Sequence, residues 1–94
     1  MKIRKSVMLE ALKVLGKVVA QTSPVEVVRS VRFVGDGGRL RLMATDGVEW
    51  VAVSVECEVA EAVDFAVEYR ALRELIRSTR GGEVEVTGKS LEWP

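Results

Sequence analysis

The sequence has no histidine and no asparagine, and it has one cysteine (Cys57) and one glutamine (Gln21). Without histidine, it lacks the commonest general base and the commonest metal ligand. A single cysteine permits no internal disulfide and no cysteine-based metal site. These absences argue against enzymatic chemistry, and we expect neither catalytic residues nor a bound metal or cofactor.

Aromatic residues and long apolar runs are scarce as well. Phe, Trp and Tyr make up 5% of the chain, so we expect an aliphatic core and no array of exposed rings that could stack on unpaired bases. The basic start of the chain is not followed by an apolar run of the kind found in signal peptides and membrane spans. We therefore expect a cytoplasmic protein with no membrane partner. Asparagine and glutamine, whose side-chain amides are thermolabile, are scarce, while 30% of the residues are charged. This combination indicates a thermophilic source.

Ninety-four residues predict one domain, 1–94. Apolar residues recur with helical spacing over 7–20, where Ser6 is the expected N-cap, and over 69–79. Gly16 inside the first helix indicates close packing, because glycine is otherwise unfavourable there. Alternating apolar residues, with valine prominent, predict strands at 1–4, 25–34, 39–44, 48–59 and 63–67, and a final hairpin over 83–93. Turns are expected at 35–38, 45–47 and 80–82.

The order of these elements suggests an internal duplication. A strand, a helix and three strands (1–60) are followed by a strand, a helix and at most two strands (61–94). We therefore predict an α+β fold of two β-α-β-β-β units, the second one incomplete, with both helices packed on one side of antiparallel sheet. The glycine-rich segments are expected to be turns rather than phosphate-binding loops, because neither opens a helix after a strand.

The formal net charge is zero, but the charges are unevenly distributed. Residues 1–21 carry five basic side chains against one acidic side chain, and residues 69–80 carry four arginines against one glutamate. Residues 45–64 carry six acidic side chains and no basic one. Any anion-binding surface must therefore arise from charge separation within the fold.

The second helix concentrates this positive charge. Its arginines are spaced by three, four and three residues, which places them on one helical face, away from the apolar residues Leu72, Leu75 and Ile76. The first helix carries lysines off its own apolar face. The basic residues on or next to these two helices are Lys13, Lys17, Arg70, Arg73, Arg77 and Arg80. Charge alone leaves DNA, RNA, an acidic protein partner and an ordinary solvated helix face all open.

Three stretches resemble the bacterial DNA sliding clamp, the beta subunit of DNA polymerase III, and its N-terminal domain best. The stretches are Met1-Lys2-Ile3 with the helix from Leu9 to Val19, Leu40-Arg41-Leu42-Met43-Ala44-Thr45-Asp46, and Phe65-Ala66-Val67 leading into the helix that contains Leu72 and Ile76. Pro24 departs from the family pattern, in which a Leu-Pro-Ile segment precedes the second strand. A clamp subunit of this family carries three such domains, and this chain matches one.

The resemblance implies a non-enzymatic processivity module. In this family both helices of each domain line a ring around duplex DNA, with contacts that are independent of sequence and sensitive to salt. The resemblance therefore predicts that the DNA-contacting residues are Lys13, Lys17, Arg70, Arg73, Arg77 and Arg80. The implied partners are duplex DNA, a DNA polymerase, a clamp loader and further copies of the chain joined through exposed sheet edges. The alternative is a protein-interaction or structural module that keeps the clamp fold and forms no ring.

Overall fold

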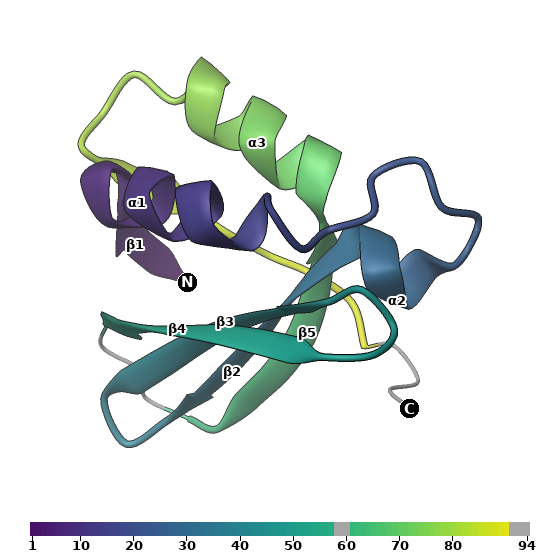
Figure 1. The fold of residues 1–94 in the computed structure, drawn as a ribbon. Helices are drawn as coiled ribbons and strands as arrows, with labels where there is room; N and C mark the ends of the chain where they lie inside the picture. Colours follow the sequence, from purple (N-terminus) through teal and green to yellow (C-terminus); the bar gives the residue numbers. More distant parts are fainter. Residues whose placement is uncertain (58–60, 91–94) are drawn as a thin grey trace.

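The computed structural model describes residues 1–57 and 61–90 (Figure 1). In these residues three helices and six strands follow the order β1 (Lys2–Arg4), α1 (Lys5–Leu15), α2 (Glu26–Arg29), β2 (Ser30–Asp36), β3 (Arg39–Thr45), β4 (Trp50–Glu56), β5 (Val63–Glu68), α3 (Tyr69–Ser78), β6 (Glu83–Glu85). The chain is therefore α+β, as the sequence predicts.

The larger sheet is antiparallel and has the order β4-β3-β2-β5. Strands β2 and β3 form a hairpin that ends in the pair Asp36–Arg39. The two turn residues, Gly37 and Gly38, have φ angles of +59° and +88°. Two-residue hairpin turns of this kind need positive φ angles, which glycine adopts at low cost. The turn predicted at 35–38 is thus confirmed, and its loop consists of residues 37 and 38.

The smaller sheet pairs the first strand with the last, because β1 lies antiparallel to β6 with Ile3 opposite Val84. In the larger sheet, β5 lies antiparallel to β2, with Phe33 opposite Phe65. The strand before each long helix therefore pairs with the strand that follows the other long helix. This reciprocal pairing is the arrangement expected of two related units that share one core.

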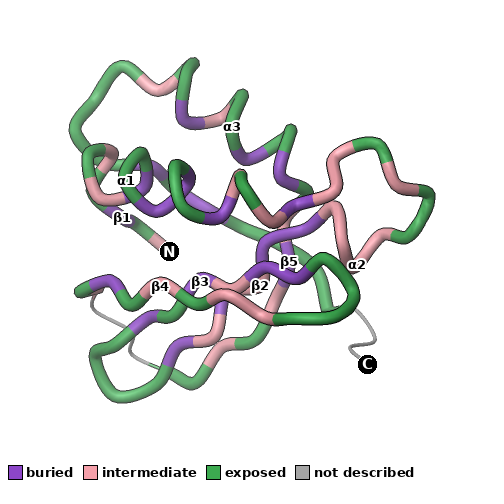
Figure 2. Tube along the Cα trace, viewed as in Figure 1, coloured by how far each residue is buried: buried purple, intermediate pink, exposed green. Residues whose placement is uncertain are grey.

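Helices α1 and α3 pack against each other on one side of the larger sheet, and α1 lies nearer to its strands β3 and β4 (Figure 1). The buried residues of the helices and of the sheet lie where these elements face one another (Figure 2), and they form one hydrophobic cluster. Its largest fully buried members are Phe33, Ile3, Met8, Leu15, Leu40, Leu42, Leu72 and Ile76. The rings of Phe33 and Phe65 stack at 4.9 Å. The core is mainly aliphatic, as expected, and complete burial of each such side chain contributes about 1.5–3 kcal/mol.

The bounds of the first helix differ from those predicted. It begins at Lys5, directly after β1, so Ser6 lies inside the helix and Arg4 takes the N-cap position without a side-chain cap. The backbone N–H of Lys5 donates to Gly82 O at 2.8 Å, and this bond stands in for the missing cap. The helix ends at Leu15 rather than at residue 20.

The strand expected over 25–34 begins only at Ser30, because residues 26–29 form the short helix α2. Two hydrogen bonds to backbone carbonyls of this segment explain why it is a helix and not a strand. Ala20 N–H donates to Val28 O at 2.9 Å, and Ser30 Oγ donates to Glu26 O at 2.8 Å. These tertiary and local bonds override the strand preference of the valines in this segment.

The hairpin expected over 83–93 does not form in the described residues. Strand β6 pairs with β1 instead, and the backbone of Lys89 exchanges two hydrogen bonds with Ala66 of β5, at 2.8 and 3.1 Å. Gly88 permits this approach, since a Cβ there would lie 2.4 Å from Ala66 O. The expected strand 90–93 falls mostly outside the described residues, as do residues 58–60 of the strand expected over 48–59.

Candidate nucleic-acid interface

Four of the six residues predicted to contact DNA lie on helices, and all six are exposed. Lys13 lies on α1, and Arg70, Arg73 and Arg77 lie on α3. Lys17 and Arg80 lie two residues beyond the ends of their helices, so their positions depend on the turns that follow.

Helix α3 separates its apolar and basic residues sharply. Tyr69, Leu72 and Ile76 are buried against the core. Arg73 and Arg77 are one helical turn apart, and Arg70 precedes Arg73 on the same side. Because Tyr69, Leu72 and Ile76 face the core, the arginines project from one flank of the helix.

Helices α1 and α3 enclose a groove that brings basic residues from both helices together. Lys13 of α1 and Arg73 and Arg77 of α3 line this groove, which has a volume of about 570 Å³. Its remaining lining includes the apolar residues Leu9, Leu12, Tyr69 and Ile76. We call this feature the interhelical groove. It joins the basic positions of two helices that are far apart in the sequence.

Contacts at both ends of the helix pair fix the groove. At one end, Lys5 Nζ donates to Thr79 O at 2.6 Å, just beyond the end of α3. A cation is favourable there, because the last carbonyls of a helix carry partial negative charge. At the other end, a Cβ on Gly16 would lie 2.6 Å from Tyr69 Oη. The close packing predicted for Gly16 is therefore present, and the two helices run antiparallel.

The positive charge in the groove is only partly compensated. Lys13 Nζ lies 3.2 Å from Glu10 Oε1 in a pair whose side chains are 72% and 75% exposed, so the attraction is weak. Within residues 1–57 and 61–90, Arg73 and Arg77 form no ion pair. These two arginines therefore retain their full charge for an external anion.

Asp64 on β5 has a basic partner of its own in the larger sheet. Asp64 accepts two hydrogen bonds from the Arg32 guanidinium, at 2.6 and 2.9 Å. The Arg32 hydrogen bond holds the pKa of Asp64 below its ordinary value, and the arginine's charge adds to this effect. Because Val31 and Phe33 are buried towards the helices, Arg32 lies on the opposite face of the sheet.

The turn at Thr45-Asp46 is a structural feature, as expected. The carboxylate of Asp46 accepts backbone N–H bonds from Val48 at 2.9 Å and from Glu49 at 3.0 Å. The bonds from Glu49 and Val48 lower the pKa of Asp46. Thr45 Oγ1 donates to Glu49 O at 2.6 Å. The side chains of Thr45 and Asp46 thereby close the turn.

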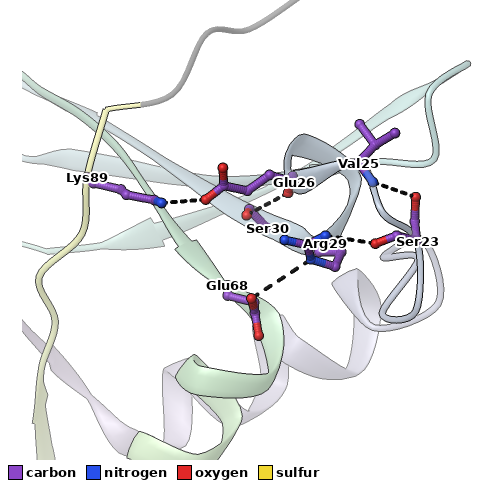
Figure 3. Close-up of polar contacts among 7 residues, drawn as sticks. All are labelled: Ser23, Val25, Glu26, Arg29, Ser30, Glu68 and Lys89. Carbon is purple, nitrogen blue, oxygen red and sulfur yellow. Dashed lines mark hydrogen bonds and ion pairs between the residues drawn. The ribbon is translucent and has the colours of Figure 1, made fainter.

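A polar cluster around α2 escaped sequence reasoning (Figure 3). Lys89 Nζ lies 2.5 Å from Glu26 Oε1, and Arg29 Nε lies 3.9 Å from Glu68 Oε2. Arg29 also donates to Ser23 O at 2.8 Å. The hydrogen bond from Lys89 lowers the pKa of Glu26. The cluster ties α2 to β5 and to the segment around Lys89, so its role is structural.

Cys57 and possible metal-binding clusters are the other places where a site could form. Cys57 Sγ, half-buried, lies 3.4 Å from Lys2 O. In the described part of the chain, no three His, Cys, Asp or Glu side chains gather closely enough to hold a metal ion. No helix in the described ranges has the length and apolarity needed to cross a membrane.

Comparison with protein-family models gives no match, and comparison with curated proteins gives none either. Solved structures do match. The beta subunit of DNA polymerase III from Caulobacter crescentus is 19% identical with a TM-score of 0.77, over 87% of this chain and 22% of that chain. The sliding clamp of Bartonella birtlesii is 23% identical with a TM-score of 0.78, over 88% and 24% of the two chains. The subunit from Pseudomonas aeruginosa is 23% identical with a TM-score of 0.76, over 93% and 25%.

The chain thus spans about a quarter of the length of these clamps. At this level of identity the likeness concerns the fold. It agrees with the resemblance that the sequence motifs indicate, and with the position of both long helices on one side of the sheet. The chain has the fold of a bacterial sliding-clamp domain.

Proposed function

We propose that this chain is a sliding-clamp-like module that lies on duplex DNA through the faces of α1 and α3. The observation that carries the proposal is the interhelical groove, which gathers Lys13, Arg73 and Arg77 from two helices on one side of the sheet. Arg70, Lys17 and Arg80 extend the basic surface along and beyond the helices. The compensating acids lie mainly on other elements, so the surface keeps a net positive charge.

The proposed contacts are with phosphates and do not read sequence. The basic side chains are long and exposed, and arginine and lysine at such positions attract the DNA backbone. Weak contacts of this kind permit sliding, which suits a tether better than tight binding. We assign the chain a binding role and no reaction.

Encircling DNA would require assembly, because the chain is about a quarter as long as the clamps it resembles. Strand β4 is an edge strand of the larger sheet, and its seven residues carry one charge, at Glu56. Edges with so few charges pair readily with another strand. We propose that copies of the chain join through sheet edges, and that the assembled module tethers a DNA polymerase and is placed on DNA by a clamp loader.

The DNA contact is tested by titrating fluorescent duplex DNA with the chain at several salt concentrations. Arg73→Glu with Arg77→Glu should weaken binding at low salt, while circular dichroism shows an intact fold. The matched control is Arg39→Glu with Arg41→Glu, which makes the same change of charge at two exposed positions of β3 that do not line the interhelical groove. Equal losses in the two variants would contradict the assignment of the DNA-facing surface.

The alternative function is a protein-interaction module with the clamp fold and no ring. The same open edge of β4 favours it, since an edge strand can accept an extended segment of a partner. This module would show no salt-dependent affinity for duplex DNA. Light scattering at high protein concentration separates the two functions further, because a strict monomer argues against a chain that assembles by itself into a clamp.

A further inference from the structure

We infer that the interhelical groove is a docking site for an acidic peptide segment that carries one apolar anchor residue. The groove combines three basic side chains with a lining that is largely apolar. Leu9 is 45% exposed there, whereas Met8, Leu12 and Leu15 of the same helix are buried. Val14 of α1 is exposed to a similar degree but lies outside the groove. The inference does not depend on the proposed DNA function.

The chemistry of the groove favours a peptide over a nucleic-acid backbone as its best-fitting occupant. The phosphates of a DNA backbone pair with Arg73 and Arg77, but its sugars offer no branched apolar side chain that could pack into the groove beside Leu9. A peptide offers both kinds of group, since carboxylates form paired hydrogen bonds with guanidinium groups and an aliphatic side chain can pack on the exposed leucine. Charge complementarity therefore selects an acidic segment, and Leu9 selects an apolar residue within it.

The dimensions of the groove set the size of this segment. The lining runs from Ser6 to Lys13 on α1 and from Tyr69 to Arg77 on α3, so the groove is about 12 Å long at 1.5 Å per residue. An extended segment of about four residues fills that length at about 3.3 Å per residue. Glu10, at the rim of the groove, disfavours an occupant that places a carboxylate beside α1. The carboxylates should therefore lie along α3.

The test is a titration of the full chain with a fluorescent eight-residue peptide that has a central leucine between glutamates. A second peptide of equal charge has serine in place of the leucine. Leu9→Ser should lower affinity for the leucine peptide about fivefold, because about half of a leucine side chain is left unburied, worth about 1 kcal/mol. Val48→Ser is the matched control, because Val48 is 88% exposed and lies outside the groove.

The outcomes separate this inference from the proposed function. Equal affinity for the leucine and serine peptides, or no effect of Leu9→Ser, would show a purely electrostatic surface and overturn the docking site. Peptide binding without duplex binding would support the docking site and contradict the DNA function. If both ligands bind, unlabelled duplex should displace the peptide, because Arg73 and Arg77 serve both. Simultaneous binding of both would place the peptide elsewhere and overturn the assignment.

Discussion

Replacing Arg73 and Arg77 together with alanine removes two charges that have no acidic partner in the described structure. For duplex DNA, the logarithm of affinity falls with the logarithm of salt concentration by about 0.9 per phosphate contact. If all six predicted residues contact phosphates, the slope for the unaltered chain is about −5. The double variant should therefore have a slope that is shallower by about 1.8.

The affinity itself should also fall in the double variant. Two exposed charge contacts of about 0.7 kcal/mol each correspond to a loss of about tenfold at low salt. Fluorescence anisotropy with a labelled duplex at four or more salt concentrations gives both the affinity and the slope. The comparison variant is Arg39→Ala with Arg41→Ala on β3, which changes the net charge equally. Parallel salt lines for the unaltered chain and the Arg73/Arg77 variant would refute the phosphate contacts.

Three further predictions concern the surroundings of the groove. Gly16→Ala should destabilise the fold by about 1–2 kcal/mol in urea unfolding, because overpacking against Tyr69 outweighs the gain in helix propensity, and Tyr69→Phe should restore part of this loss. Glu10→Gln should tighten duplex binding about twofold at low salt, because it removes an anion of the exposed pair with Lys13; an unchanged affinity would place Lys13 away from the DNA. The pKa of Asp64 is lowered in the folded state, so its ion pair with Arg32 stabilises the fold fully above about pH 4 and ceases to do so as the pH falls through that pKa. Asp64→Asn should lower the free energy of unfolding at pH 7. The variant should also lose less stability than the unaltered chain between pH 7 and pH 2.5, as measured by unfolding at each pH.

The sequence predicted those features that depend on local spacing. The three-and-four spacing of Arg70, Arg73 and Arg77 placed them on one side of α3, away from its buried residues. Alternating apolar residues identified most of the strands of the larger sheet. Glycine and Asx chemistry identified the two tight turns, because a positive φ angle and a side-chain cap both have a residue signature.

Features that depend on contacts between distant segments could not be predicted in this way. The order of strands, and with it the pairing of β1 with β6, depends on contacts between segments at opposite ends of the chain. The bond from Lys5 to Thr79 and the pair formed by Lys89 and Glu26 join residues that periodicity cannot relate. Helix α2 formed where valines favoured a strand, because backbone bonds to neighbouring segments decided its conformation.

The central claim is that duplex DNA lies on the helix side of the molecule. It is tested most directly by following the backbone amide signals of the ¹⁵N-labelled chain by NMR while duplex DNA is added at low salt. The account predicts that shifted signals cluster on α1 and α3, around Lys13, Arg73 and Arg77, while those of Arg39, Arg41 and their neighbours on β3 stay in place. Shifts confined to the sheet, or spread evenly over both sides, would contradict it.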